Sequence, residues 1–358
     1  MKLIYGFITL FMLLFVSACE KDKPKGTDKN EDDTYSFQGQ KLLVANEGAY
    51  GNGNSSFSIL DLEKDTIYNE VYKTVNKTVL GDVFQYIAKA KNDYFLLVNN
   101  SNEIIRIDAK TLQFKASINV PQPRVMQSTG NKAYVGSLYN NQIQVINLED
   151  NSIQTQIQTP YQNNEDLLLL NNDLWVTSWD TACHYLTRIN VLADTVCEQV
   201  LIGGKAPYAI IKDCHNDLWV FAGNPTKGVR STITVLDGRD HNIKRIYGAN
   251  HNAEFIKPAM NVTKDTLYFL TVDYMNSGIT NGLYKMPINA LSLPVTPFIA
   301  SERYQYFWAL AINPINNHIF IGDPKGFIQQ GDVVEYDASG TALHRYKTGL
   351  GPGFFLFD

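Results

Sequence analysis

Few residues in this chain of 358 stand in an arrangement that supports catalysis or metal binding. The sequence has no Gly-x-Ser-x-Gly elbow, no His-Glu-x-x-His or Cys-x-x-Cys motif and no P-loop. Residues 51–54, with the sequence GNGN, follow an expected strand, but no helix opens after them, so a phosphate cradle is not supported. The six histidines are scattered without ligand spacing, and a metal site needs several converging groups, so we expect loop residues and no metal. They are His184, His215, His241, His251, His318 and His344.

Some carboxylates lie near the ends of expected strands and could line one face of the protein. Acidic pairs there could bind calcium, yet no cluster of carboxylates stands out from the sequence. We therefore expect a protein that is not an enzyme and that has no cofactor of its own. The carboxylates are Asp82, Glu165, Asp166, Asp273 and Asp323.

A repeated stretch organises the elements that must position these side chains. The pentapeptide Asn-Asp-Leu-Trp-Val occurs at residues 172–176 and again at residues 216–220. Other segments share its pattern of a polar turn, a large residue and an apolar or β-branched run. Successive anchors are 39 to 53 residues apart, a spacing typical of propeller blades. The seven anchors are Leu42, Phe95, Tyr134, Trp175, Trp219, Tyr268 and Phe320.

Each repeat is interpreted as four short strands without helical periodicity, which predicts an all-β fold. The third strand of most units ends in Asp or Asn, whose side chain can bond its own backbone two residues on. The first unit lacks an innermost strand, and the chain ends in a lone strand near residues 354–357. If that strand completes the first blade, the ring closes without an exposed sheet edge. We predict a seven-bladed β-propeller with four-stranded blades; six or eight blades stay open, since units one and six are irregular.

The N-terminal segment has the features of a secretory signal. Residues 1–18 contain one cation, Lys2, and an apolar run too short for a spanning helix. A small residue precedes Cys19, the pattern of a bacterial lipobox, so we expect cleavage before Cys19 and its lipidation. The alternative is an ordinary signal peptide with a chance cysteine. Residues 19–38 have almost nothing to bury and are expected to form a disordered tether, with the propeller domain at 39–358.

Composition limits the kinds of partner. Charged residues make up 19% of the chain and the formal net charge is −5, so no basic stripe is available for nucleic acid. No second apolar stretch approaches the roughly 20 residues of a membrane span, so we expect contact with a membrane through the lipid anchor only. Three cysteines remain, Cys183, Cys197 and Cys214. The first two could form a disulfide across adjacent strands, or all three could be free thiols.

One face of the predicted ring is rich in amides and aromatic residues. The loops beyond the anchor strands and the starts of the inner strands meet there around the central channel. Such a surface suits a polar, partly flat, uncharged ligand with aromatic anchors. Any single Asn could instead be a turn residue. The candidate ligand-binding residues are Asn46, Tyr50, Phe84, Asn99, Arg124, Tyr139, Trp179, Asn224, Tyr274 and Trp308.

The same regions carry a resemblance to a known family. Residues 44–56 (VANEGAYGNGNSS), 80–85 (LGDVFQ), 98–102 (VNNSN) and the closing 351–354 (GPGF) resemble the YncE-like propeller lipoproteins of Bacteroidota. The similarity covers nearly all of residues 40–358. That family includes BtuG-type surface lipoproteins, which capture cobalamin and cap the TonB-dependent transporter BtuB.

The resemblance implies a lipoprotein anchored in the outer membrane and facing the cell exterior. It would capture cobalamin or a related corrinoid as a transported ligand and pass it to a BtuB-like TonB-dependent transporter. An extracytoplasmic propeller enzyme, such as a metal-dependent lactonase or a lyase, is the alternative from another class. A propeller scaffold that binds a glycan or a protein is the third.

Overall fold

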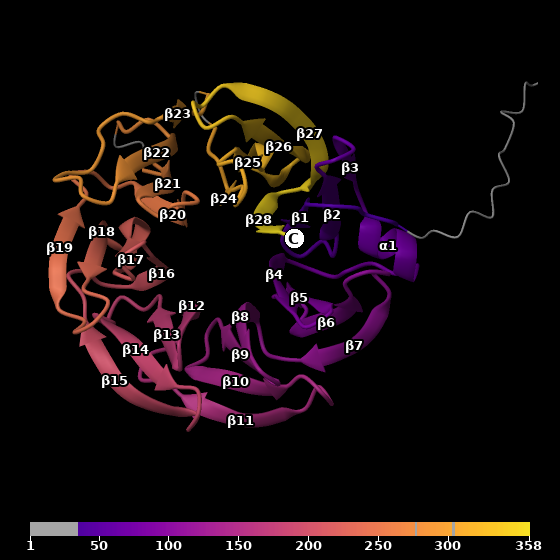
Figure 1. The fold of residues 1–358 in the computed structure, drawn as a ribbon, viewed down its shortest axis with the longest axis horizontal. Coiled ribbons are helices and arrows are strands. Elements are labelled where there is room, and N and C mark those ends of the chain that lie inside the picture. The colour runs from indigo at the N-terminus through magenta and orange to yellow at the C-terminus, as the bar shows by residue number, and fades with distance from the viewer. Residues whose placement is uncertain (1–34, 276–277, 303–304) are drawn as a thin grey trace, which may run out of the picture. The chain divides into compact units, whose positions relative to one another are not determined.

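The computed structural model describes residues 35–275, 278–302 and 305–358. They form a ring of seven antiparallel sheets of four strands each, as Figure 1 shows down the ring axis. The seven-bladed all-β propeller predicted from the repeat is thus confirmed. The signal peptide, Cys19 and most of the tether lie outside the described residues. No helix of the described segments is long and apolar enough to cross a membrane.

Each blade has an inner strand at the channel, and its other strands follow in order toward the outside. Blade 1 contains β28 (Pro352–Phe357), β1 (Lys41–Asn46), β2 (Ser56–Asp61) and β3 (Thr66–Tyr68). Blade 2 contains β4 (Phe84–Ala90), β5 (Asp93–Val98), β6 (Glu103–Asp108) and β7 (Phe114–Asn119). Blade 3 contains β8 (Pro123–Thr129), β9 (Lys132–Ser137), β10 (Gln142–Asn147) and β11 (Ile153–Gln158). Blade 4 contains β12 (Asn164–Leu170), β13 (Asp173–Ser178), β14 (Tyr185–Asn190) and β15 (Thr195–Leu201).

The remaining blades follow the same plan. Blade 5 contains β16 (Pro207–Lys212), β17 (Leu218–Asn224), β18 (Val229–Leu236) and β19 (Ile243–Gly248). Blade 6 contains β20 (Glu254–Met260), β21 (Thr266–Val272), β22 (Gly282–Pro287) and β23 (Ile299–Ala300). Blade 7 contains β24 (Ala309–Ile312), β25 (Ile319–Asp323), β26 (Gln330–Tyr336) and β27 (Ala342–Leu350). A short helix α1 (Val71–Asn76) precedes blade 2, and two 3-10 turns cover Pro225–Lys227 and Lys325–Phe327.

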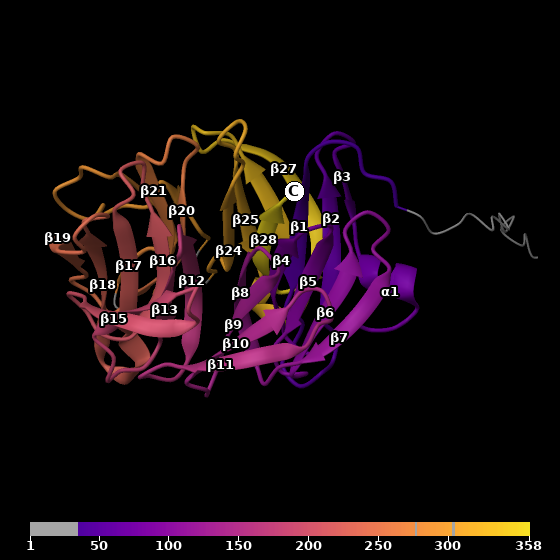
Figure 2. The same cartoon turned by 60° about the horizontal axis from the view of Figure 1, so that its bottom comes forward.

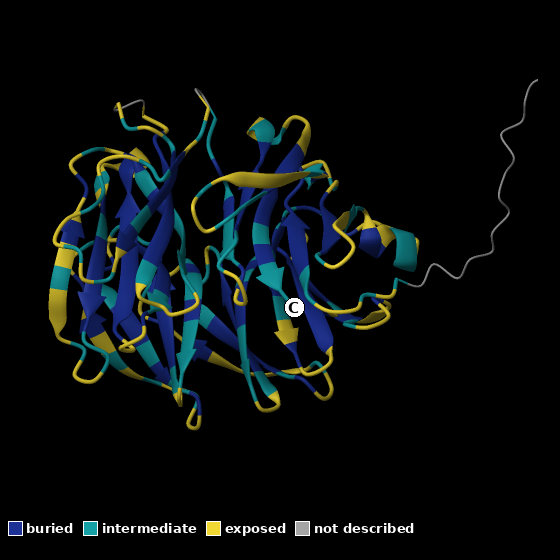
Figure 3. Cartoon of the chain, turned by 45° about the horizontal axis from the view of Figure 1, so that its top comes forward, coloured by how far each residue is buried: buried dark blue, intermediate teal, exposed yellow. Residues whose placement is uncertain are grey.

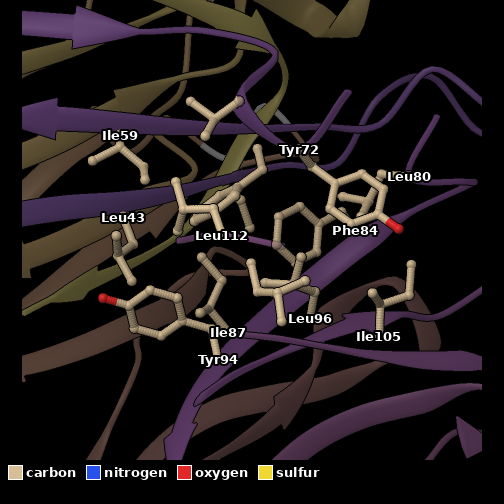
Figure 4. Packing of buried hydrophobic residues seen from close by; sticks show 14 of the residues in the cluster. Leu43, Ile59, Tyr72, Leu80, Phe84, Ile87, Tyr94, Leu96, Ile105 and Leu112 are labelled. Atoms are coloured by element: carbon tan, nitrogen blue, oxygen red, sulfur yellow. The ribbon is translucent and has the colours of Figure 1, made fainter. Parts of the chain in front are cut away.

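The second strand of every blade is almost entirely buried, which explains the repeated anchor. Trp175 and Trp219 are each 1% exposed, and the other five anchors are at most 3% exposed. Neighbouring blades bury both faces of these strands, as the packing of Leu43, Phe84 and Leu96 between blades 1 and 2 illustrates (Figure 4). The outer strands face solvent, and Figure 3 shows that most exposed residues lie on these strands and on the loops.

The predicted turns after the third strands are also confirmed. In six blades the side-chain oxygen of the last Asp or Asn accepts a backbone N–H two residues on. These side chains replace backbone partners that the chain loses where it reverses direction. They belong to Asp61, Asp108, Asn147, Asn190, Asp237 and Asp337.

The C-terminal strand closes the ring. β28 pairs with β1 in antiparallel register, with Val44 opposite Phe355. The side-chain carboxylate of Asp358 forms an ion pair with Lys41, with 2.9 Å between Oδ2 and Nζ. The same carboxylate also contacts the amine of Lys89 and the hydroxyl of Tyr94. These partners hold the pKa of Asp358 at about 2 against the opposing effect of burial. Contacts between successive inner strands run around the ring and return from β28 to β4.

The thiols of the described residues are free. Cys183 is buried and its Sγ donates to the carbonyl oxygen of Tyr185 at 3.2 Å, while Cys197 and Cys214 are exposed. The sequence left open a disulfide between Cys183 and Cys197 or three free thiols, and the structure has free thiols.

Ring closure predicts a specific loss of stability in the Phe355→Ala variant. Phe355 packs with Val44, Phe320 and Val333, which belong to blades 1 and 7. Truncation should leave a cavity and lower the free energy of unfolding by about 3 kcal/mol, measured by chemical denaturation. Leu343→Ala, on the exposed strand β27, is the control and should change it by less than about 0.5 kcal/mol. An equal effect of both variants would contradict closure by β28.

Candidate binding site

The strand register brings the candidate residues to one end of the ring. The first residue of an inner strand pairs with the last residue of the second strand, as in Phe84 with Val98, Pro123 with Ser137 and Asn164 with Ser178. The loops after the second strands therefore surround the openings of the inner strands. We call this end the loop face; Figure 2 shows the loops gathered at the ends of the ring. It comprises residues 47–55, 99–102, 138–141, 179–184, 225–228, 273–275, 278–281 and 324–329.

A cavity of about 280 Å³ lies among the inner strands. Its apolar walls include Val125, Ile211 and Phe354. Six of the seven inner strands, or the residues just before them, also supply side chains with polar groups. These are Gln85, Arg124, Glu165, Asp166, Tyr208, Glu254, Lys257 and Trp308, and Trp179 joins them from the loop after β13.

Arg124 and Glu165 form an ion pair inside the cavity. Arg124 Nε donates to Glu165 Oε1 at 2.7 Å, and the two side chains are 22% and 13% exposed. Burial alone would lower the pKa of Arg124, but Glu165 and Glu47 more than compensate and raise it. Glu165 Oε2 is buried and has no hydrogen-bond partner among the described residues. A bound ligand could therefore donate to this oxygen, because an unpaired buried acceptor is costly.

Glu47 connects three blades at the mouth of the cavity. Its Oε1 accepts hydrogen bonds from Trp308 Nε1 at 2.8 Å and from Gln85 Nε2 at 3.3 Å. Glu47 follows β1, Gln85 lies on β4, and Trp308 precedes β24. The carboxylate thus fixes the orientation of the Trp308 ring, which lines the cavity.

Two carboxyl groups of the cavity titrate near neutral pH. Burial raises the pKa of Asp166 to about 7, although backbone N–H groups of Ile210 and Leu167, each at 2.9 Å, oppose the shift. Burial, with repulsion from Glu165, raises the pKa of Glu254 to about 7. The cavity therefore gains negative charge as the pH rises through neutrality.

Several aromatic side chains are exposed on the loop face. Tyr50 is 80% exposed, Tyr139 75% and Tyr274 42%. Electrostatic interactions connect Tyr139 to Arg124, and Tyr274 to Glu254 and Glu47, so both tyrosines lie near the charged cavity. Tyr274, Tyr306, Trp308 and Phe327 form a chain of edge-to-face contacts with ring centroids 5.8 to 6.0 Å apart. Trp179 Nε1 donates to the Gly223 carbonyl oxygen at 2.9 Å, which fixes its ring.

Comparison with known proteins identifies the family. Residues 40–350 match the family described as "Domain of unknown function (DUF5074)". The chain belongs to the DUF5074 family. The search of curated proteins found no match.

Solved structures share the fold of this DUF5074 protein at low sequence identity. A quinonprotein alcohol dehydrogenase-like protein from Bacteroides thetaiotaomicron is 16% identical, with a TM-score of 0.68 over 90% of this chain and 79% of that one. A protein from Bacteroides fragilis, provisionally named a 6-phosphogluconolactonase, is 10% identical, with a TM-score of 0.66 over 89% and 98% of the two chains. A protein from Lactobacillus plantarum is 12% identical, with a TM-score of 0.64 over 90% and 100%. At these identities the likeness shows the fold alone.

The candidate residues from the sequence separate into those on the cavity or loop face and those in the interior. Arg124, Trp179 and Trp308 line the cavity. Tyr50, Tyr139 and Tyr274 are exposed on the loop face. The other four are buried: Phe84, Asn46, Asn99 and Asn224, at 0 to 7% exposure. Whether any of the ten contacts a ligand stays a prediction.

The buried candidates have structural contacts that explain their position. Phe84 belongs to the hydrophobic core between blades 1 and 2. Asn46 donates to Ser58 Oγ at 2.8 Å and accepts from Thr348 Oγ1 at 2.9 Å. Asn99 donates to the Pro123 carbonyl oxygen at 3.1 Å, joining blade 2 to blade 3. These amides satisfy backbone and side-chain groups inside the protein.

The predicted face of amides and aromatic residues did not include the charged cavity. Glu47, Glu254 and Lys257 were not among the candidates, and Glu165 and Asp166 were considered only as carboxylates near strand ends that could line one face and bind calcium. The available signal was a charged residue inside a short apolar strand, as in NEDLLLL (164–170) and EFIKPAM (254–260). Within the described residues, no group of three or more His, Cys, Asp or Glu could hold a metal ion.

The raised pKa of Glu254 predicts a pH-dependent stability gain in Glu254→Gln. The folded pKa of about 7 exceeds the ordinary value of 4.5, so wild-type folding is disfavoured increasingly between these pH values. The variant lacks this penalty, and its free energy of unfolding should exceed that of wild type by about 2 kcal/mol at pH 8.

Urea denaturation at pH 4 and pH 8 measures this gain. At pH 4 the carboxyl group is mostly protonated in both states, so the variant and wild type should be nearly equal. Glu149→Gln, at an exposed position, is the control and should have little effect at either pH. An equal change for Glu254→Gln at both values would contradict the raised pKa.

Proposed function

We propose that this DUF5074 protein is a non-catalytic surface lipoprotein that captures cobalamin or a related corrinoid on its loop face. The bound corrinoid would pass to a BtuB-like TonB-dependent transporter. The lipid on Cys19 and the tether would hold the propeller at the outer membrane, facing the cell exterior. The observation that carries the proposal is a set of exposed aromatic side chains around a polar cavity.

The exposure of these aromatic side chains favours a binding role. Tyr139 is 75% exposed and has a left-handed backbone, with φ of 52°, held by a hydrogen bond from its N–H to Asn163 Oδ1 at 2.7 Å. An exposed ring on a fixed backbone contributes little to folding, and a tyrosine side chain provides contact area at low entropic cost. Aromatic residues of this kind are typical energetic centres of binding surfaces.

The chemistry of a corrinoid matches both the aromatic side chains and the polar groups of the site. Its flat ring can stack on tyrosine and tryptophan faces, and its peripheral amides can bond to carboxylates and amides. Glu165 Oε2 offers a buried acceptor without a partner among the described residues. The Arg124–Glu165 ion pair compensates its own charges and needs no counter-charge from the ligand.

One observation favours an enzyme as the second candidate. Asp166 and Glu254, with pKa values of about 7, are suited to donate and accept protons at neutral pH. A fold neighbour is provisionally named a 6-phosphogluconolactonase. Lactone hydrolysis by the purified protein, lost in Asp166→Asn or Glu254→Gln, would favour this candidate over capture.

Titration calorimetry of the purified full chain with cyanocobalamin tests the proposal. We expect one-to-one binding that EDTA and added calcium leave unchanged. Tyr139→Ala and Tyr274→Ala should each weaken binding about tenfold, because exposed aromatic anchors commonly contribute about 1 to 2 kcal/mol. Phe114→Ala, on the outer strand β7, is the matched control, since its side chain is 50% exposed away from the loop face. The absence of heat at high micromolar ligand would contradict the corrinoid proposal.

A further inference from the structure

Lys257 occupies an unusual position in the channel. It lies on the inner strand β20 where the pairing with β21 shifts between Ile256 and Ala259. Its φ of 51° is in the left-handed region that non-glycine residues avoid. A bulge of this kind re-aims a side chain relative to the regular strand. Lys257 is accordingly among the residues that line the cavity.

The amine of Lys257 has no hydrogen bond or ion pair in the described part of the chain. It lies over the Trp308 ring, whose centroid is 6.0 Å from Nζ. Other lysines form ion pairs: Lys244 Nζ lies 2.8 Å from Asp217 Oδ2, and Lys325 Nζ lies 2.7 Å from Asp332 Oδ2. The amine of Lys257 is therefore not held by a carboxylate, although the cavity contains several.

The charged groups that act on Lys257 come from three other elements: β8, β12 and the loop after β1. Burial lowers its pKa, Arg124 adds to this effect, and Glu47, Glu165 and Asp166 oppose it. The result is a pKa below the ordinary lysine value, so a larger fraction of the amine is neutral and nucleophilic at neutral pH.

Asp166 supplies an acid in the same cavity. Its carboxyl group is held by the backbone N–H groups of Leu167 and Ile210. The positive charge of Lys257 lowers the pKa of Asp166, so the two side chains interact. Burial nonetheless keeps that pKa at about 7, and the protonated form is available up to neutral pH.

We propose that Lys257 captures small aldehydes or ketones in the channel as an imine, with Asp166 as the proton donor. The amine nitrogen attacks the carbonyl carbon, and the carbonyl oxygen takes the proton of Asp166 to give a carbinolamine. The proton lost by nitrogen returns to the Asp166 carboxylate. A second proton transfer from Asp166 releases the hydroxyl group as water and leaves a protonated imine beside the Asp166 carboxylate. Return of the nitrogen proton to that carboxylate gives the neutral imine, so the net change is amine plus carbonyl to imine plus water.

The surroundings of Lys257 suit this chemical class. Val125, Ile211 and Phe354 offer apolar contact for a short carbon chain. The face of Trp308 stabilises a protonated imine nitrogen as it does the ammonium group. This reaction does not require the proposed corrinoid capture, although Glu165 and Trp308, which that proposal also uses, line the same cavity.

Reductive trapping tests the proposal. The full chain is incubated with butanal and sodium cyanoborohydride, which reduces an imine to a stable secondary amine, and alkylated lysines are quantified by peptide mass spectrometry. Lys257 should react at least about tenfold faster than Lys285, because burial raises the neutral fraction of its amine and Asp166 supplies the proton that the reaction needs. Lys285 is a matched comparison: its amine also lies over aromatic rings, at 4.5 Å from Phe298, but on β22 outside the cavity.

Variants separate the roles of the two residues. Lys257→Arg should remove the fast-reacting site, while Lys285→Arg should leave it unchanged. Asp166→Asn should slow trapping at Lys257 about a hundredfold at pH 6, with a smaller difference at pH 8, where wild-type Asp166 has lost its proton. Circular dichroism confirms that each variant folds. Trapping at Lys257 no faster than at Lys285, or an Asp166→Asn rate equal to wild type at both pH values, would overturn the proposal.

Discussion

The pairing of β28 with β1 is the interaction on which the rest of the structure depends. Each blade is a thin sheet with two apolar faces, and it can bury both only between neighbours. Trp175 and Trp219 are buried in this way between successive blades. At the first blade the chain has no inner strand of its own, so the C-terminal residues Pro352–Phe357 must supply it. Without that strand, the faces of blades 1 and 7 would meet solvent.

Closure of the ring also buries the charged groups in the channel. The inner strands turn alternate side chains toward one another, and charged groups that would be solvated on an open sheet are withdrawn from water. This burial is the first cause of the shifted pKa values of Asp166, Glu254 and Lys257. The loops at the same end carry exposed tyrosines, so one face combines a charged interior with an aromatic rim.

The sequence was sufficient for the fold because the blades repeat a strong local pattern. Buried aromatic anchors, terminal Asp or Asn turns and a spare C-terminal strand are all visible without coordinates. The site was only partly predictable. Which inner-strand residue faces the channel depends on register and bulges, as at Lys257, and these follow from packing between blades. Asn46 and Asn99 were chosen for their position after the second strand, yet the ring uses their amides for contacts between strands and blades.

The central claim, that the loop face binds the ligand, is tested most directly by hydrogen–deuterium exchange with and without cyanocobalamin. The account predicts slower exchange in the loops at 47–55, 138–141 and 179–184. Exchange should be unchanged in the turns at 62–65, 130–131 and 171–172, which lie at the opposite end of the same blades. Protection confined to those opposite turns, or no protection with saturating ligand, would contradict the account.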